Sequence, residues 1–455
     1  MKKLATITLA LLCTSIFLAG CSPEATFQKA EELEKNGKAE EAIKLYHRAA
    51  EKGFVPAQIK MGDIYYEGVL RTKDFPEAVR WFTLAAEQNN PVAQRKLGYC
   101  YYNGEGVEEN PIKAVDLWLK SAKQGDHVAQ KNIGISYQNG IGVQADPLEA
   151  IRWYNEAAAN GDITAKFLLG ECYQDGKIVE KDSSKAVKLF HEAAKEGHPE
   201  AQRNLGFAYA FGDGIKKNQT EAVKWIKKAA EQGDMLAEGY LGNCYEMGNG
   251  IEQDDFEAAK WYSKAAKQGS SLAQYELGRC YIWGKGIKKS ELEAIKWLTK
   301  SAEQGYANAM LLLGCLYTKY KGPTPEDIRL CQFLGIDPCR INLSDCDTEE
   351  NIPEGEKWIK KAFEFGNDVA LLVLAHSRVK YGQTENAKEI IEWLTKVAEQ
   401  DNPMASLMLG VIYMSGTFSF PQDTQKAMTY FKKSAELGNQ IAQKVLDELK
   451  KSPIN

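Results

Sequence analysis

The chain of 455 residues has few of the side chains that most often do chemistry in proteins. Histidine occurs only at His47, His127, His191, His198 and His376, and no two of them show the HExxH spacing of a zinc-binding helix. No Cys-x-x-Cys pair is present, so the usual sequence signature of a structural zinc site is also missing. We therefore expect no metal and no cofactor, and we interpret all five histidines as surface or inter-helix residues.

Excess positive charge is also absent. The chain has 57 Lys and Arg against 62 Asp and Glu, a net charge of −5, and no Lys/Arg run is interleaved with aromatic residues. Proteins that bind nucleic acid usually carry a basic patch of that kind. The composition therefore argues against a nucleic-acid partner, and it is otherwise that of a solvated globular protein.

Long apolar runs are missing except at the N-terminus, where Lys2 and Lys3 precede a run too short to span a bilayer comfortably. The run ends in Leu-Ala-Gly-Cys, which resembles a bacterial lipobox in which Cys21 is lipidated. We predict a lipoprotein signal peptide over residues 1–20. Ser22 resembles an outer-membrane sorting signal, so we expect an outer-membrane anchor facing the periplasm. The alternative is a plain signal peptide cut near Ala19.

Four columns of residues recur every 36 positions over most of the chain, and such periodicity indicates a repeat architecture. The glycine column consists of Gly62, Gly98, Gly134, Gly170, Gly206, Gly242, Gly278 and Gly314. Alanine, tyrosine and Trp/Leu columns keep the same register. The step from Trp297 to Trp358 is 61 residues, which places an insertion between them.

Each repeat reads as two amphipathic helices, for example over residues 91–104 and 110–125. Pro111 suits the first turn of the second helix, and Gly125 suits its C-terminal cap. Gly98 predicts close approach of a neighbouring helix. Because neither helix pair can bury its apolar stripe alone, neighbouring repeats must stack.

The stretch "LGYCYYNGEGVEENPIKAVDLWLKSAKQG", residues 97–125, resembles the Sel-one-like repeat, a relative of the tetratricopeptide repeat. This resemblance implies an all-α, right-handed α-solenoid of about eleven 36-residue helix–turn–helix repeats that binds other proteins. We predict the solenoid over 21–318, a cysteine-containing insertion over 319–352, and degenerate C-terminal repeats with a capping helix over 353–455.

The cysteines fall into two groups. Cys100, Cys172, Cys244 and Cys280 share one column, and we interpret them as small buried residues because stacked helices are too far apart for disulfides there. A cysteine-rich branch of the resembled family joins the two helices of each repeat by a disulfide, but these repeats carry one column cysteine each. Cys315, Cys331, Cys339 and Cys346 form a possible disulfide pool with three pairings open.

One string looks catalytic: Ser377 and Lys380 form an SxxK, the spacing found in penicillin-recognising enzymes. Some members of the resembled family have carried a β-lactamase label. No KTG or SDN motif supports the string here, and it stands in a degenerate repeat. We therefore expect no catalytic residue and a non-enzymatic protein.

The first helix of each pair lines the concave face in tetratricopeptide-like arrays, so partner contacts are expected where first-helix positions vary between repeats. The candidates are the aromatic and arginine residues at such positions: Tyr99, Phe207, Phe211, Arg279 and Trp283. The alternative is that these aromatic side chains pack locally under the inter-helix loop.

Four functions remain open from the sequence. The favoured one is a non-enzymatic, outer-membrane-tethered periplasmic scaffold that binds a protein of the envelope or secretion machinery. The second is an immunity protein that neutralises a secreted antibacterial effector such as a phospholipase. The third is a surface-exposed host-interaction factor, and the least supported is a β-lactamase-type hydrolase.

Overall fold

The structure is a computed structural model that describes residues 22–319, 351–367, 369–370, 373–374, 386–416 and 421–451. These residues form α-helices joined by short loops, and none of them is in a β-strand. The chain divides into two compact units, one ending at Gln232 and one beginning at Gly233. No helix among the described residues is long and apolar enough to cross a membrane.

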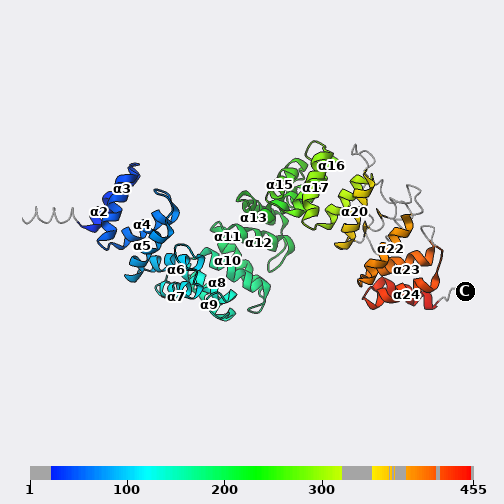
Figure 1. The fold of residues 1–455 in the computed structure, drawn as a ribbon, viewed down its shortest axis with the longest axis horizontal. Coiled ribbons are helices and arrows are strands. Elements are labelled where there is room, and N and C mark those ends of the chain that lie inside the picture. Colours follow the sequence, from blue (N-terminus) through cyan, green and yellow to red (C-terminus); the bar gives the residue numbers. More distant parts are fainter. Residues whose placement is uncertain are drawn as a thin grey trace, which may run out of the picture. The chain divides into compact units, whose positions relative to one another are not determined.

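The helices of both units follow one another as antiparallel pairs along the chain (Figure 1). The N-terminal unit contains α2 (Pro23–Lys35), α3 (Ala39–Glu51), α4 (Val55–Glu67), α5 (Phe75–Glu87), α6 (Pro91–Asn103), α7 (Pro111–Ala122), α8 (His127–Asn139), α9 (Pro147–Ala159), α10 (Ile163–Asp175), α11 (Ser183–Lys195), α12 (Pro199–Phe211) and α13 (Gln219–Glu231).

The C-terminal unit continues the same alternation. It contains α14 (Met235–Met247), α15 (Asp255–Lys267), α16 (Ser271–Trp283), α17 (Glu291–Glu303), α18 (Ala307–Tyr317), α20 (Ile352–Glu364), α22 (Asn386–Glu399), α23 (Pro403–Ser415), α24 (Thr424–Glu436) and α25 (Gln440–Lys451). Consecutive helices pack on one another from α2 to α13, from α14 to α20 and from α22 to α25, so the fold is the predicted all-α solenoid.

The two helices of a repeat approach closely at the glycine column. In α6, a Cβ placed on Gly98 would lie 2.4 Å from Trp118 Nε1 of α7, and every other glycine of the column meets a side chain of its own second helix at a comparable distance. The indole of Trp118 is buried and donates a hydrogen bond to the Arg95 carbonyl at 3.1 Å. The prediction of close approach at Gly98 is confirmed.

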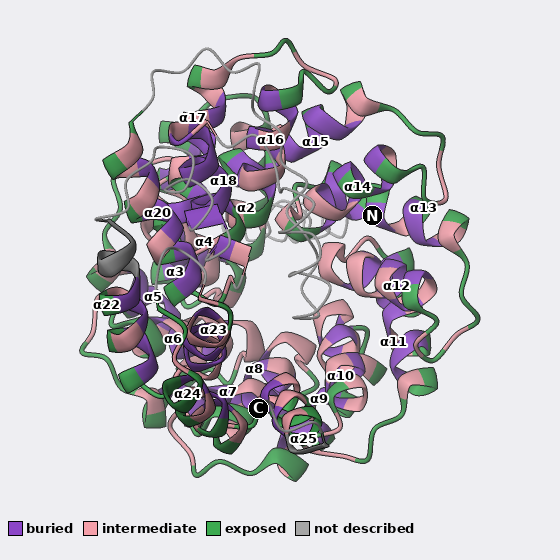
Figure 2. Cartoon of the chain, turned by 90° about the vertical axis from the view of Figure 1, so that its right-hand side faces the viewer, coloured by how far each residue is buried: buried purple, intermediate pink, exposed green. Residues whose placement is uncertain are grey.

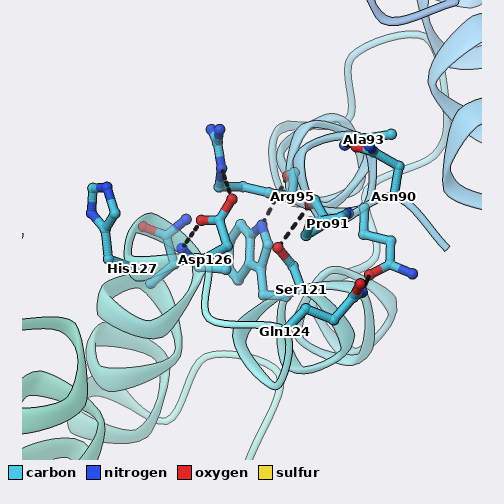
Figure 3. A network of polar contacts seen from close by, with 12 residues as sticks. Asn90, Pro91, Ala93, Arg95, Ser121, Gln124, Asp126 and His127 are labelled. Carbon is cyan, nitrogen blue, oxygen red and sulfur yellow. Dashed lines mark hydrogen bonds and ion pairs between the residues drawn. The ribbon is translucent and has the colours of Figure 1, made fainter. Parts of the chain in front are cut away.

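The two helices of a repeat are also joined by a row of polar side chains, most of which are amides. The buried Gln94 of α6 accepts a hydrogen bond from Gln124, at the end of α7, at 2.9 Å (Figure 3). Equivalent bonds recur in other repeats, all between residues 30 positions apart: Gln88 to Gln58, Asn160 to Gln130, Gln232 to Gln202, Gln268 to Glu238 and Gln304 to Gln274. We call this row the glutamine ladder.

Asp126 ties α6 to α8 in the same region (Figure 3). One of its carboxylate oxygens accepts the Ala129 N–H at 2.8 Å and so caps α8. The other oxygen accepts from Arg95 Nε at 3.0 Å. A single N-cap therefore also fixes the spacing of two consecutive first helices.

The Gly-x-Gly of the inter-helix loop serves packing. Gly104 ends α6 in the left-handed conformation, with φ 72°. Gly106 also has positive φ, and a Cβ there would lie 2.3 Å from the Phe75 carbonyl carbon of the preceding repeat. The Asn110 N–H then closes the loop on the Tyr101 carbonyl at 2.7 Å. The motif is thus a turn between two helices and not a phosphate-binding loop, which would follow a strand.

The predicted insertion interrupts a repeat whose loop remains closed at its ends. The Asn351 N–H donates to the Tyr317 carbonyl at 3.0 Å, the same bond that Asn110 makes to Tyr101. Asn351 then caps α20 through the Glu354 N–H. The helices α18 and α20 therefore form an ordinary pair, and the insertion replaces the loop between them.

The four column cysteines are buried free thiols, as predicted. Burial is the main cause that raises their pKa, to about 12 for Cys100 and Cys280 and to about 11 for Cys172 and Cys244. Because the thiolate is the reactive form, these side chains are inert packing residues.

Candidate protein-interaction surface

The variable residues of the first helices form one face of the repeat array. Within the N-terminal unit, α8, α10 and α12 lie on the inner side of the array and α9 and α11 on its outer side (Figure 2). Buried positions of each first helix face its partner helix, while half-buried and exposed positions face inward. We call this surface of the first helices, taken separately in each unit, the first-helix face.

At its start, the first-helix face is occupied by ion pairs between consecutive repeats. Lys60 Nζ lies 2.9 Å from Glu34, and Lys96 Nζ lies 2.7 Å from Asp63. All four side chains are only about a third exposed. Since each charge has a partner on the next helix, this part of the face is electrostatically satisfied.

Tyr99 also takes part in a contact between consecutive repeats. It is half-buried, its ring lies edge-on to Trp118 with centroids 5.5 Å apart, and its hydroxyl accepts from Asn132 Nδ2 at 2.8 Å. The local-packing alternative describes this side chain. Tyr99 therefore shapes the face but offers little free surface to a partner.

Phe207 and Phe211 lie one helical turn apart on α12, with ring centroids 6.2 Å apart. Phe207 is half-buried, whereas Phe211 is 70% exposed at the last residue of the helix. The Phe207 ring thus supports the Phe211 ring, which projects from the end of the helix. Phe211 is the more suitable partner anchor.

A pocket of about 240 Å³ opens beside α10, and its wall includes Gln138, Leu168, Glu171, Asp175 and Ile178. Glu171 belongs to the same variable column as Tyr99, directly after the column glycine. Burial raises the pKa of the Glu171 carboxyl, and the neighbouring negative charge of Asp175 raises it further.

In the C-terminal unit, α16 carries a stripe of Tyr275, Arg279 and Trp283 at successive helical turns. The Arg279 guanidinium lies 5.5 Å from the Trp283 ring centroid and 5.8 Å from that of Tyr275. Trp283 remains 40% exposed at the end of the helix. The contact with Arg279 holds the indole in place, so it is a pre-ordered, exposed aromatic side chain.

A buried network of charged side chains supports this stripe. Arg279 pairs with Glu276 one turn earlier, and its second amino group lies 3.8 Å from Glu246 of α14. Glu246, only 8% exposed, also accepts a hydrogen bond from the Tyr262 hydroxyl at 2.8 Å and lies 3.6 Å from Lys285 Nζ. The guanidinium is therefore fixed by two carboxylates from two helices.

Sequence reasoning singled out Arg279 and Trp283 but missed the residues that hold them, Glu246 and Tyr262. Glu246 stands in a column whose other members are Tyr66, Tyr102, Gln138, Gln174, Ala210 and Ile282, so nothing in the repeat marks it. The glutamine ladder was also missed, although its signal was present in the recurring Ala-Gln pairs at Gln58, Gln94, Gln130, Gln202 and Gln274.

Several predicted residues lie outside the described residues. They are Cys21, Ser377, Lys380, Cys331, Cys339 and Cys346. Cys315 is buried in α18, and its disulfide pairing stays a prediction. Within the described ranges, no group of three or more His, Cys, Asp or Glu side chains could hold a metal ion.

Fold and surface together define an all-α repeat protein whose first helices carry variable residues. The Sel1 repeat model matches residues 31–54, 55–90, 91–126, 127–162, 163–198, 199–234, 236–270, 271–306 and 403–439. The chain belongs to the Sel1 repeat family. Repeats of this family generally mediate protein–protein interactions, and the fold is typical of non-enzymatic scaffolds.

Among solved structures, the chain is similar to a protective antigen present in uropathogenic Escherichia coli strains, at 31% identity and a TM-score of 0.69, over 90% of this chain and 82% of that one. A Sel1 repeat protein from Oxalobacter formigenes matches at 29% identity and TM-score 0.49, over 72% and 87% of the two chains.

An immunity protein from Pseudomonas aeruginosa is 19% identical, with a TM-score of 0.32, over 47% of this chain and 81% of that one. No curated protein matches the chain significantly.

Proposed function

We propose that this chain is a lipid-anchored scaffold of the bacterial envelope that binds a partner protein on its first-helix face. The observation that carries the proposal is the geometry at Trp283. Its indole is exposed, yet Arg279 holds it, and Arg279 is in turn fixed by Glu276 and Glu246. Ordered aromatic residues of this kind cost little entropy on binding and dominate interface energies.

Capture of a partner by the immobilised soluble body, residues 22–455, tests this proposal. We expect a protein to co-purify with the wild type, and capture to fall at least tenfold with Trp283→Ala or Phe211→Ala. The matched control is Phe256→Ala, because Phe256 is 65% exposed but lies at the start of the second helix α15. Absence of any captured protein, or an equal loss with Phe256→Ala, contradicts the proposal.

Anchoring rests on the Leu-Ala-Gly-Cys motif that ends at Cys21. The full chain produced in a bacterium is expected to incorporate labelled palmitate and to fractionate with the outer membrane. The Cys21→Ser variant should lose the label and stay unprocessed or soluble. Palmitate labelling of Cys21→Ser equal to that of the wild type would show that Cys21 is not the lipidated residue.

A second candidate, a surface-exposed host-interaction factor, is favoured by the 31% identity to a protein described as a protective antigen. Protease treatment of intact cells separates the two. Degradation of the protein on intact cells supports surface exposure, whereas protection until the outer membrane is opened supports the periplasmic scaffold. Capture of a phospholipase-like effector would instead identify an immunity protein.

A further inference from the structure

The pocket beside α10 combines an apolar wall with two carboxylates. Leu168 and Ile178 provide the apolar wall. Gln138 reaches the pocket from α8, where its Oε1 accepts the Tyr154 hydroxyl at 2.6 Å. The side chain of Tyr154 is buried in α9, so this wall of the pocket is held by three consecutive helices.

The negative charge in the pocket is poorly compensated from within the chain. Glu171 and Asp175 stand four residues apart on α10, where like charges repel. Lys177 also lines the pocket, with its Nζ 3.5 Å from Asp175. The two side chains are 82% and 60% exposed, so this ion pair contributes little. From α12, the charge of Arg203 favours ionised Glu171 and that of Glu200 opposes it.

The size of the pocket limits what it can hold. Its volume of about 240 Å³ is below the ~300–1,000 Å³ of clefts that enclose drug-sized ligands, so it fits a single side chain. Two carboxylates suit a guanidinium, which binds such oxygens through several parallel N–H groups. A long aliphatic stem suits the wall of Leu168 and Ile178.

We propose that this pocket receives an arginine side chain of the partner protein. Arginine is enriched in the centres of protein interfaces whereas lysine is depleted, which decides between the two cations. The inference rests on the proposed scaffold function, and it adds the chemistry of one partner residue and its place in the N-terminal unit.

Titration of the full chain with Nα-acetyl-arginine methylamide tests the pocket without any knowledge of the partner. Methyl resonances of Leu168 and Ile178, assigned by substitution, report occupancy. We expect both to shift and to saturate with the arginine probe. The citrulline analogue, which has nearly the same shape but no charge, should bind at least tenfold more weakly. Equal binding of the two probes would overturn the proposal.

Substitutions in the pocket test whether the arginine probe binds there. Glu171→Gln and Asp175→Asn keep the shape of the pocket, and each should weaken the arginine probe at least tenfold. Glu180→Gln removes a charge from the exposed part of the same loop and should leave the affinity unchanged. Unchanged affinity in Glu171→Gln, or an equal loss in Glu180→Gln, would also overturn the proposal.

Failure of this inference can be told from failure of the proposed function. If a partner is captured through Trp283 but binds Glu171→Gln as well as the wild type, the pocket assignment is wrong and the scaffold function stands. If no partner is captured, the proposed function fails, and the probe titration still decides whether the pocket is selective for a guanidinium.

Discussion

Gly98 of α6 lies against the indole of Trp118 in α7, so close that a Cβ on Gly98 would stand 2.4 Å from Trp118 Nε1. The contact fixes the distance between the two helices of a repeat. The indole also hydrogen-bonds to the Arg95 carbonyl, which leaves it little freedom to move aside.

Gly98→Ala is therefore expected to destabilise the protein by about 1–3 kcal/mol, because the methyl group overpacks the helix interface. Gly239→Ala in α14 is the matched control, because no atom lies within 4 Å of a Cβ placed there. That change should stabilise by roughly 0.5–1 kcal/mol through helix propensity. Urea denaturation measures both. Equal effects of the two variants would show that packing against Trp118 does not explain Gly98.

The glutamine ladder predicts a measurable coupling between the two helices of a repeat. Gln94→Ala and Gln124→Ala should each destabilise, and a double-mutant cycle should give about 0.5–1.5 kcal/mol of coupling for their hydrogen bond of 2.9 Å. In the repeat that starts with α10, Lys166 and Glu196 replace the two amides and pair at 2.7 Å.

The salt dependence of the coupling should distinguish the charged pair of the ladder from its neutral pairs. Lys166 is 17% and Glu196 43% exposed, so their coupling should shrink as NaCl rises to 0.5 M. The coupling between the neutral Gln94 and Gln124 should stay constant. Denaturation cycles at both salt concentrations measure this. A salt-independent Lys166–Glu196 coupling would mean that charge contributes nothing to it.

Most of the fold could be predicted from the sequence, because residues of one column occupy equivalent positions in successive repeats. The close approach of two helices at Gly98 could be predicted, because the glycine column recurs in register with the alanine and tyrosine columns. The ladder was predictable in principle from the recurring Ala-Gln pairs. Trp283 was a candidate partner contact because it stands in a variable column of the first helices, and the structure leaves it 40% exposed.

The supporting residues could not be predicted in the same way. The pocket joins Gln138 of α8 to Glu171 and Ile178 of α10 and its loop, and no column of the repeat links them. Tyr99 was chosen for its variable position, and periodicity did not show that its ring packs on Trp118. Side-chain contacts between unlike repeats depend on three-dimensional neighbours that periodicity does not encode.

His198 predicts a pH effect. Its Nδ1 accepts the Ala201 N–H at 3.4 Å at the start of α12, and its ring stacks on Phe167 with centroids 4.7 Å apart. Burial lowers its pKa below 6.5, an effect that outweighs the opposing charges of Glu200 and Asp162. The folded state thus prefers the neutral ring, and its contribution to stability is present above pH 6.5 and lost as the pH falls through the lowered pKa.

The variant His198→Asn keeps a capping acceptor, as Asn90 does in α6. The wild type should lose stability relative to this variant as the pH falls from 7.5 to 5. Thermal unfolding at each pH gives the difference. Asn90→Ala, which removes the non-titrating N-cap of α6, serves as control and should show no such trend. A gain of wild-type stability at low pH would contradict the assigned role of His198.

The Tyr262–Glu246 hydrogen bond offers a test of the network beneath Trp283. Tyr262 is buried and its hydroxyl donates to the Glu246 carboxylate at 2.8 Å, whereas the equivalent Tyr154 donates to the neutral Gln138 at 2.6 Å. Hydrogen bonds to a charged group contribute about 1.5–3 kcal/mol and neutral ones about 0.5–1.5. Tyr262→Phe should therefore destabilise more than Tyr154→Phe in urea denaturation.

Tyr262→Phe should also affect partner binding at the proposed interface. Loss of the hydroxyl frees Glu246 to draw Arg279 away from Trp283, so Tyr262→Phe should weaken partner capture severalfold at a temperature where the variant is fully folded. Phe256→Ala, at the exposed start of the second helix α15, is the control and should leave capture unchanged. Equal capture by both variants would show that the order of the Arg279–Trp283 pair does not depend on Glu246.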